Sequence, residues 1–188
     1  MNNIKDVPVP SYYRKLANYF PAHEMKHAHQ LQALVEDVPY YGLMETGEYL
    51  VLYGDFAEFL FIDYLLVNRD QRGSGVGTRL LQRLQSRNIP ILLEVEPIDP
   101  NDVDTKKRRR FYERNGFALA QGVQYEREDR HGESYTMDLL YWSPSQKISD
   151  DRVLHMMTTV CRRIHNYRAM QFYGRIPAQP EEVLSLVR

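Results

Sequence analysis

The chain has one cysteine, no long apolar run and no excess of charge of either sign. Cys161 is alone among 188 residues, which rules out an intramolecular disulfide and fits a reducing cytoplasm. No stretch approaches the roughly 20 uninterrupted apolar residues of a membrane span, and residues 1–30 lack the apolar segment of a signal peptide. The 24 basic and 25 acidic side chains nearly cancel. We therefore expect a cytoplasmic protein that binds neither membranes nor nucleic acid.

Apolar residues make up 43% of the chain, enough for the core of one domain with an appendage. Helical spacing of apolar residues predicts helices, and runs rich in aromatic and branched residues predict strands. The expected helices cover residues 11–20, 22–36, 76–87, 106–114 and 149–172, and the clearest strands cover 58–67, 91–96, 117–121 and 134–142, with antiparallel strands also in 40–57.

The helix expected at 149–172 carries one apolar stripe, formed by Val153, Met157, Val160, Cys161 and Ile164. A helix of this length is rarely stable unless such a stripe is buried. Either this chain's own sheet or a second copy can cover it, so a homodimer is one interpretation. The sequence after residue 176 is predicted to be a tail punctuated by prolines.

Three glycines, Gly73, Gly75 and Gly77, lie between the apolar strand 58–67 and the helix that follows it. A glycine in a helix costs up to about 1 kcal/mol relative to alanine, so three in one turn need a reason. Without side chains in the way, successive N–H groups and a helix N-terminus can point at a phosphate. The turn therefore predicts an anion site.

The spacing of this turn limits which phosphate ligand it can hold. A nucleotide-triphosphatase loop needs a lysine, which the turn lacks. A dinucleotide fold needs a third glycine where Thr78 stands, although Glu94 and Glu96 lie where a ribose-binding acid would be expected. Dinucleotide folds also continue as alternating strands and helices, whereas antiparallel strands are predicted here. An oxidoreductase of this type stays open as an alternative.

Two motifs resemble those of the GNAT N-acetyltransferases. Arg72-x-x-Gly75-x-Gly77, after the strand Tyr64-Leu-Leu-Val67, resembles the acyl-CoA pyrophosphate loop of that family. Residues 111–117, Phe-Tyr-Glu-Arg-Asn-Gly-Phe, resemble its second signature. The resemblance covers about residues 10–142 and implies a fold of the α/β (α+β) class, a mixed, mostly antiparallel sheet flanked by helices. It divides the chain into a GNAT domain at 1–145 and a C-terminal helical extension at 146–188, which packs on that domain or on a partner.

The resemblance also implies acetyl-CoA as co-substrate, held where strands 58–67 and 91–96 run parallel and splay apart. The pantetheine arm would bond to backbone at Leu65, Leu66 and Val67. The pyrophosphate would take the amides of Arg72, Gly73, Ser74, Gly75, Val76, Gly77 and Thr78. Arg83 and Arg87 are either a solvated helix face or contacts for the adenosine 3′-phosphate. At the second motif, Thr105 and Arg108, within a basic run, replace the asparagine and alanine that the family usually has. This departure puts the contacts to acetyl-CoA on the side of the second motif in doubt.

The implied reaction is direct attack of an amine on the thioester, which needs a neutral amine and a proton for the departing thiolate. Tyr112 of the second motif is the expected acid, unless it only packs under the sheet. Asp63, which interrupts an apolar strand, and Glu94 on the facing strand are the candidate bases, acting directly or through water. Each could instead be the ion-pair partner of a nearby basic residue.

Residues 23–27, His-Glu-Met-Lys-His, match the His-Glu-x-x-His pattern of zinc proteases. Pro21 places His23 at the start of the expected helix, and no third ligand pattern follows. We expect no metal, although His23 or His27 could touch substrate.

The sequence therefore predicts an acetyl-CoA-dependent N-acetyltransferase acting on an amine of a small molecule or a protein. A non-catalytic CoA-binding regulatory module is the alternative from another class. The acceptor cannot be named, and residues 11–45 and 122–135 are expected to form its pocket.

Overall fold

The computed structural model describes residues 8–129, 131–145 and 147–187. The boundary residue 146 of the expected extension lies outside this part, as do residues 1–7, 130 and 188. The helices are α1 Ser11–Ala17, α2 Ala28–Asp37, α3 Val76–Gln85, α4 Val103–Arg114, α5 Asp150–Val160, α6 Ala169–Tyr173 and α7 Pro180–Val183. The strands are β1 Tyr41–Glu45, β2 Tyr49–Asp55, β3 Leu60–Val67, β4 Ile91–Val95, β5 Ala118–Leu119, β6 Val123–Glu128, β7 Ser134–Thr136, β8 Asp138–Trp142 and β9 Leu184–Leu186. Of the helices described, none is both long and apolar enough to cross a bilayer.

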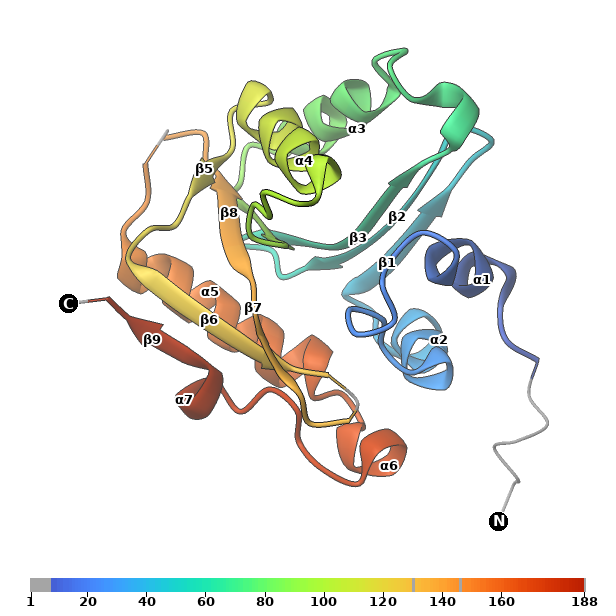
Figure 1. Ribbon diagram of the computed structural model, residues 1–188, viewed down its shortest axis with the longest axis vertical. Helices are drawn as coiled ribbons and strands as arrows, with labels where there is room; N and C mark the ends of the chain where they lie inside the picture. The colour runs from blue at the N-terminus through green and yellow to red at the C-terminus, as the bar shows by residue number, and fades with distance from the viewer. Residues whose placement is uncertain (1–7, 130, 146, 188) are drawn as a thin grey trace.

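The main sheet has six strands in the order β1-β2-β3-β4-β8-β5 (Figure 1). Every neighbouring pair is antiparallel except β3 and β4, which run parallel. These two pair only over Leu60–Ile62 and Ile91–Leu93, and they diverge beyond that point. The expected mixed, mostly antiparallel sheet with a splayed parallel pair is therefore confirmed.

A β-bulge lies where β3 leaves β4. On β2, Tyr53 pairs with Ile62 and Leu52 pairs with Tyr64, so Asp63 between them has no partner on β2. An extra residue in one strand bends that strand and increases its twist. The bulge thus places Asp63 at the point where β3 turns away from β4.

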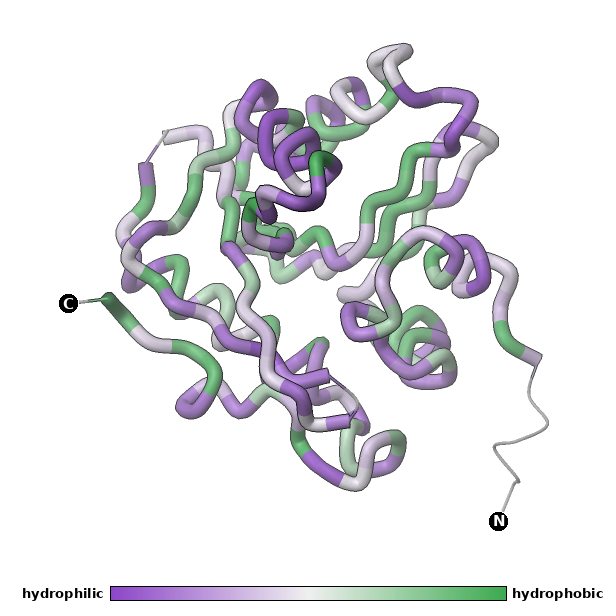
Figure 2. The backbone as a smooth tube through the Cα atoms, in the orientation of Figure 1, coloured by the Kyte–Doolittle hydropathy of each residue, from purple (hydrophilic) through white to green (hydrophobic). Residues whose placement is uncertain are grey.

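Helices cover both faces of the sheet and divide the core into two clusters. Figure 1 shows α3 and α4 together on one face, with α1, α2 and α5 on the other. On the first face Leu80 and Leu81 pack with Ile91, and on the second Leu34 and Met157 belong to the cluster around the sheet. The strands form the hydrophobic centre between these layers, whereas α4 is mostly hydrophilic (Figure 2).

The C-terminal segment differs from the expected single helix over 149–172. Helix α5 ends at Val160, a π-helical turn covers Cys161–His165, and Arg168 has a left-handed φ of 49° before α6. The whole predicted stripe is buried within the core of this same chain. The irregular turn follows from this packing, because it keeps the side chains after Val160 directed at the sheet.

The expected proline-punctuated tail also contains a strand. β9 pairs with β6, and with β7 they form a second sheet in the order β7-β6-β9. β6 is not among the strands expected from the sequence, because its alternation of valine and tyrosine with polar residues is short. The C-terminal residues are therefore part of the same folded unit (Figure 1).

The expected helix over 22–36 begins later, at Ala28. His27 is its N-cap, and its Nδ1 accepts a hydrogen bond of 3.3 Å from the backbone N–H of His29. Residues 22–27 therefore form turns before the helix, and the His-Glu-Met-Lys-His segment does not lie on a helix as expected. This connection between α1 and α2 is fastened to β3, because the Tyr64 hydroxyl donates to the carbonyl of Glu24 at 2.9 Å and accepts from the N–H of Lys26 at 3.0 Å.

Candidate active site

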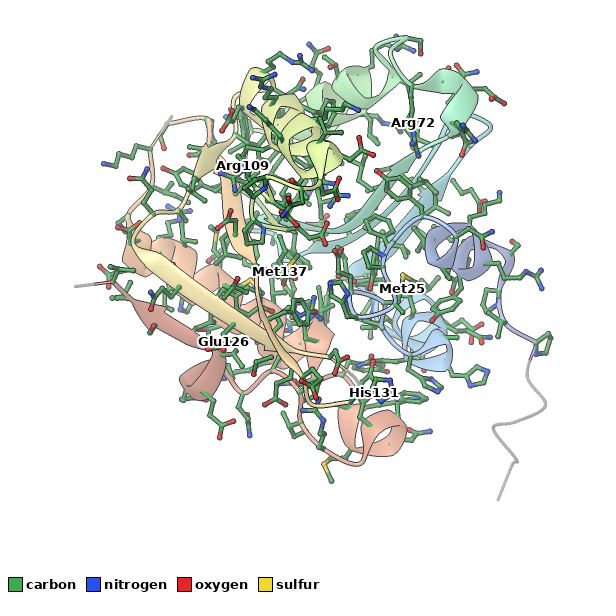
Figure 3. All side chains as sticks on the ribbon, in the orientation of Figure 1. Met25, Arg72, Arg109, Glu126, His131 and Met137 are labelled. Atoms are coloured by element: carbon green, nitrogen blue, oxygen red, sulfur yellow. The ribbon has the colours of Figure 1, made fainter. Side chains whose placement is uncertain are left out.

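A pocket of about 760 Å³ occupies the gap where β3 and β4 separate. One end is lined by the glycine turn, and the other by the connection between α1 and α2 together with β6 and Met137. Arg72 and Met137 both line this pocket, and Figure 3 shows Arg72 beside the turn that precedes α3 and Met137 near the middle of the molecule. Tyr112 lines it from α4. The volume is typical of sites for small molecules and cofactors.

The glycine turn is shaped as an anion site. Gly73 and Gly75 have φ of 81° and 82°, a left-handed conformation that glycine adopts without strain. Gly75 is the N-cap of α3, so the first N–H groups of a helix of 10 residues open beside it. A Cβ added to Gly73 would meet nothing within 4 Å. These N–H groups and the helix dipole favour a negatively charged ligand.

Gly77 also has a role in helix packing. A Cβ on Gly77 would lie 2.9 Å from Cζ of Phe111 and 3.4 Å from a methyl carbon of Val67. Its missing side chain lets α3 pack closely against α4 and β3. The space that a side chain at residue 77 would need is occupied by other residues of this chain. Packing alone therefore accounts for a glycine at this position.

Tyr112 lines the pocket with a hydroxyl that has no bonding partner. Within the part of the chain that the structure describes, no group hydrogen bonds this hydroxyl. Burial raises the pKa of Tyr112 well above its ordinary value, against the opposing charge of Arg108. The phenol is therefore protonated at neutral pH and able to donate to a group bound in the pocket.

The carboxylate of Asp63 has two partners. Lys26 Nζ lies 2.5 Å from Oδ1, and the Tyr41 hydroxyl donates to Oδ2 at 2.5 Å. The side chains of Lys26 and Asp63 are each only 3% exposed. Burial lowers the pKa of Lys26, against the raising effect of Asp63. Asp63 thus lines the pocket as expected, with both oxygens already bonded.

Glu94 is likewise held by two partners, one from β6 and one from the π-helical turn after α5. Arg127 of β6 lies 2.9 Å from Oε2, and His165 Nε2 lies 2.6 Å from Oε1. Burial acts to raise the pKa of Glu94, but Arg127 and His165 together hold it well below its usual range. Burial lowers the pKa of His165 to about 4, so we assign a neutral ring that donates from Nε2. Glu94 is ionised.

Charged residues outside the expected catalytic set also line the pocket, among them Glu24, Glu96 and Arg108. Arg108 contacts Glu96 at 2.9 Å, and Glu24 lies beside this pair. Burial, the charge of Glu96 and a carboxyl–carboxylate hydrogen bond raise the pKa of Glu24 to about 8. In the sequence, Glu24 belongs to the His-Glu-x-x-His pattern, Glu96 stands where a dinucleotide fold would place a ribose ligand, and Arg108 departs from the family motif. No local pattern brings these three residues together.

Other basic residues considered for phosphate contacts have internal partners. Arg87 pairs with Asp55 at 2.8 Å, and Arg83 reaches the Tyr49 hydroxyl at 3.5 Å. In the basic run of α4, Arg109 pairs with Asp138. Arg72 donates from Nε to the carbonyl of Val67 at 3.2 Å and lies over the ring of Tyr19.

Comparisons with known proteins agree with this architecture. Residues 36–119 match the family model described as "Acetyltransferase (GNAT) domain". Over 179 residues the chain is 38% identical to a Bacillus subtilis (strain 168) protein named "Putative acetyltransferase YjbC", with 94% of this chain and 93% of the relative covered. The chain therefore belongs to the GNAT acetyltransferases. This membership confirms the resemblance seen in the two motifs and argues against the dinucleotide oxidoreductase.

The fold is shared with a solved structure described as "Putative acetyltransferase from GNAT family from Bacteroides thetaiotaomicron". The TM-score is 0.67 at 21% identity, with 87% of this chain and 91% of that chain covered. The covered share of this chain is larger than the 84 residues matched by the family model.

Proposed function

We propose that this protein transfers an acetyl group from acetyl-CoA to an amine by direct attack in a ternary complex. One observation carries the proposal: a single pocket is lined by the glycine turn, by Tyr112 and by the carboxylates of Glu24 and Glu96. The anion site suits the pyrophosphate, and the far end leaves room for an acceptor. The acceptor class is an amine of a small molecule or a protein.

The splayed strands suit the pantetheine arm. Beyond Ile62 no strand of the described residues pairs with β3 on its β4 side. Backbone groups of Leu65, Leu66 and Val67 that face the gap can bond an extended ligand there, as in strand addition. The amides from Arg72 to Thr78 would then take the pyrophosphate, with Gly73 and Gly75 allowing close approach.

The chemistry assigned to Tyr112 is proton donation to sulfur. The amine nitrogen attacks the thioester carbonyl, the C–N bond forms and the C–S bond breaks. The leaving thiolate takes the phenolic proton of Tyr112, and the phenolate recovers a proton from the nitrogen of the new amide. The raised pKa of Tyr112 keeps the proton available at neutral pH.

Asp63 and Glu94 remain candidates for accepting the proton of the amine, directly or through water. Their existing bonds to Lys26 and to Arg127 weaken both as proton acceptors, because a cation beside a carboxylate favours its charged form. We assign them first to holding the walls of the pocket in place.

The test is a titration of the full chain with acetyl-CoA and, separately, with NAD, followed by calorimetry and thermal unfolding. Acetyl-CoA at 100 times its Kd should stabilise the fold by about 2.7 kcal/mol, whereas NAD should not. Gly75→Asn and Gly75→Asp form a matched pair, because both side chains tolerate a positive φ and only one adds a negative charge. We expect the aspartate variant to bind acetyl-CoA at least about 10-fold more weakly than the asparagine variant.

Stabilisation by NAD alone, or equal affinity of the two variants, would contradict the proposed cofactor site. Release of CoA with a panel of amines then separates an enzyme from a module that binds CoA without turnover.

A further inference from the structure

The connection between α1 and α2 carries Glu24 on the wall of the pocket, although its residues 22–27 belong to no helix or strand. Backbone N–H and C=O groups that lie away from water need partners, and no strand ladder supplies them here. The N–H groups of Glu24 and Met25 bond to carbonyls within the same connection, at 3.1 and 3.4 Å. Five other backbone groups of residues 23–27 bond to tyrosine hydroxyls. This part of the wall is therefore held from outside its own segment.

Two of the tyrosines hold the segment from the first half of the chain. The buried Tyr64 of β3 donates to the carbonyl of Glu24 at 2.9 Å and accepts from the N–H of Lys26 at 3.0 Å. Tyr13 of α1 donates to the carbonyl of Lys26 at 3.0 Å. Burial raises the pKa of Tyr64 well above its ordinary value, so its hydroxyl keeps the proton that it donates. Both backbone groups of Lys26 are thus fixed, and Asp63 fixes its ammonium group.

The other two tyrosines reach the segment from the C-terminal part of the chain. Tyr135 of β7 donates to the carbonyl of His23 at 3.1 Å, and the rings of these two residues lie 4.9 Å apart. The N–H of His27 donates to the hydroxyl of Tyr173 in α6 at 2.8 Å, and that hydroxyl donates to Oε1 of Gln30 at 2.6 Å. A hydroxyl can accept and donate at the same time, so one side chain can join two segments.

The four residues form what we call the tyrosine clamp: Tyr13, Tyr64, Tyr135 and Tyr173. They lie on four different elements, and three of them lie outside residues 36–119, the part that matches the family model. Phenylalanine at any of these positions would keep the ring and lose the bond to the backbone of the wall or, at Tyr64, two such bonds. The hydroxyl groups are therefore the feature that needs a reason.

Resting on the acetyl transfer proposed above, we propose that the tyrosine clamp positions the acceptor by holding residues 23–27 in one shape beside the cofactor. The clamp acts through the backbone of the wall, so its members are positioning residues. The wall cannot swing outward as a lid without breaking its bonds to α1, β3, β7 and α6 together. The acceptor must fit the space that this fixed wall leaves, which favours a small, unbranched amine over a branched amine or a polypeptide chain.

The experiment compares two amines that differ only by two methyl groups, with CoA release at saturating acetyl-CoA as the readout. Propylamine is unbranched, and 2,2-dimethylpropylamine has the same chain with two methyl groups on its second carbon. The wild-type kcat/KM should favour propylamine by about 10-fold or more, because a fixed wall leaves no room for the additional groups. Tyr64→Phe should lower kcat/KM for propylamine by about 5- to 10-fold and change that for the branched amine by less than about 2-fold, because a looser wall loses its shape and gains room.

Tyr40→Phe is the matched control. The Tyr40 hydroxyl donates to the carbonyl of Arg163 at 3.4 Å, so this variant also loses a bond between a side chain and the backbone, but Tyr40 does not line the pocket. It should leave both kcat/KM values within about 2-fold of the wild type. Tyr173→Phe is a second test variant, in case Tyr64→Phe does not fold, and should narrow the preference for propylamine in the same direction. Acetyl-CoA affinity should stay within about 2-fold in every variant.

Amide hydrogen exchange provides a readout that needs no acceptor. The N–H of Lys26 loses its partner in Tyr64→Phe, and the N–H of His27 loses its partner in Tyr173→Phe. Each amide should exchange about 5-fold faster or more in its own variant, while the amides of Leu92 and Leu93 in β4 should not change. Faster exchange throughout the chain would instead mean a general loss of stability, and would overturn the positioning role.

An unchanged preference between the two amines in both test variants, or a parallel loss of acetyl-CoA affinity, would also overturn the positioning role. A wild type that prefers the branched amine, or that binds acetyl-CoA and turns over neither amine, would overturn the inference about the acceptor. If the wild type does not bind acetyl-CoA at all, the proposed function itself is wrong.

Discussion

Replacing Lys26 with methionine should destabilise the protein strongly, although it removes a single charge. The Lys26–Asp63 pair joins the α1–α2 connection to the bulge of β3, at 2.5 Å with both side chains 3% exposed. Methionine preserves most of the volume but leaves the Asp63 carboxylate buried without its cation. Breaking one partner of a buried pair costs about 3–5 kcal/mol.

For a domain of this size, each kcal/mol shifts Tm by about 2–4 °C, so Lys26→Met should lower Tm by roughly 6–20 °C. The chain offers a matched exposed pair. Lys15 and Glu45 are also 2.5 Å apart, but their side chains are 52% and 28% exposed. Lys15→Met should cost no more than about 1 kcal/mol, because an exposed pair is solvated in both states.

The assay is urea and thermal unfolding of Lys26→Met, Lys15→Met, Asp63→Asn and the double variant Lys26→Met, Asp63→Asn. Asparagine keeps an oxygen that can accept from the Tyr41 hydroxyl and carries no charge. The double variant should recover most of the loss, and the cycle should give a coupling energy of about 2 kcal/mol or more. A cost below about 1 kcal/mol for Lys26→Met, or a double variant no better than the single one, would refute the reasoning.

Three further outcomes are expected. Tyr112→Phe should leave acetyl-CoA affinity within about 2-fold while lowering kcat by about 10²-fold, measured by calorimetry and CoA release; unchanged turnover would return Tyr112 to a packing role. Because the folded state raises the pKa of Glu24 to about 8, it keeps a proton that the unfolded chain has lost above about pH 4.3. Stability should therefore fall as pH rises from 6 to 8, by up to about 1.4 kcal/mol per pH unit, and the difference between wild type and Glu24→Gln in urea unfolding should show this slope. A fragment of residues 1–146 lacks β9 and the buried face of α5, so thermal or urea unfolding of it should show no cooperative transition. A stable, soluble fragment would mean that the core folds without the C-terminal elements.

The fragment prediction follows from the most consequential difference between sequence and structure. The C-terminal helical extension expected at 146–188 supplies His165, which contacts Glu94 at 2.6 Å. The Gln30 amide of α2 also donates to the carbonyls of His165 and Tyr167, at 3.0 and 2.8 Å. Residues of the expected extension therefore bond to Glu94 of the pocket wall and to Gln30 of α2, so they pack against the rest of this chain.

The sequence by itself determined the elements whose signals are local. The apolar run of β3, the glycine turn and the second motif each depend on neighbouring residues, so the strand, the tight turn before α3 and the family could be identified from them. Gly73 and Gly75 illustrate this. Both have a positive φ beside the start of a helix, and glycine is the residue type that adopts such a φ without strain. The positions of Asp63, Glu94 and Tyr112 on one pocket followed from the family resemblance.

Only the tertiary structure decided which charges meet. Lys26 reaches Asp63 across 37 positions of sequence, and His165 reaches Glu94 across 71. No local pattern encodes such distances, because these pairs form only after the connection before α2 and the irregular turn after α5 have packed against the sheet. Burial then sets their chemistry: where a cation is close, as at Glu94, the carboxylate stays ionised, and where a second carboxylate is close, as at Glu24, it holds its proton. The difference lies in desolvation and in the sign of the neighbouring charge, which exist only in the folded chain.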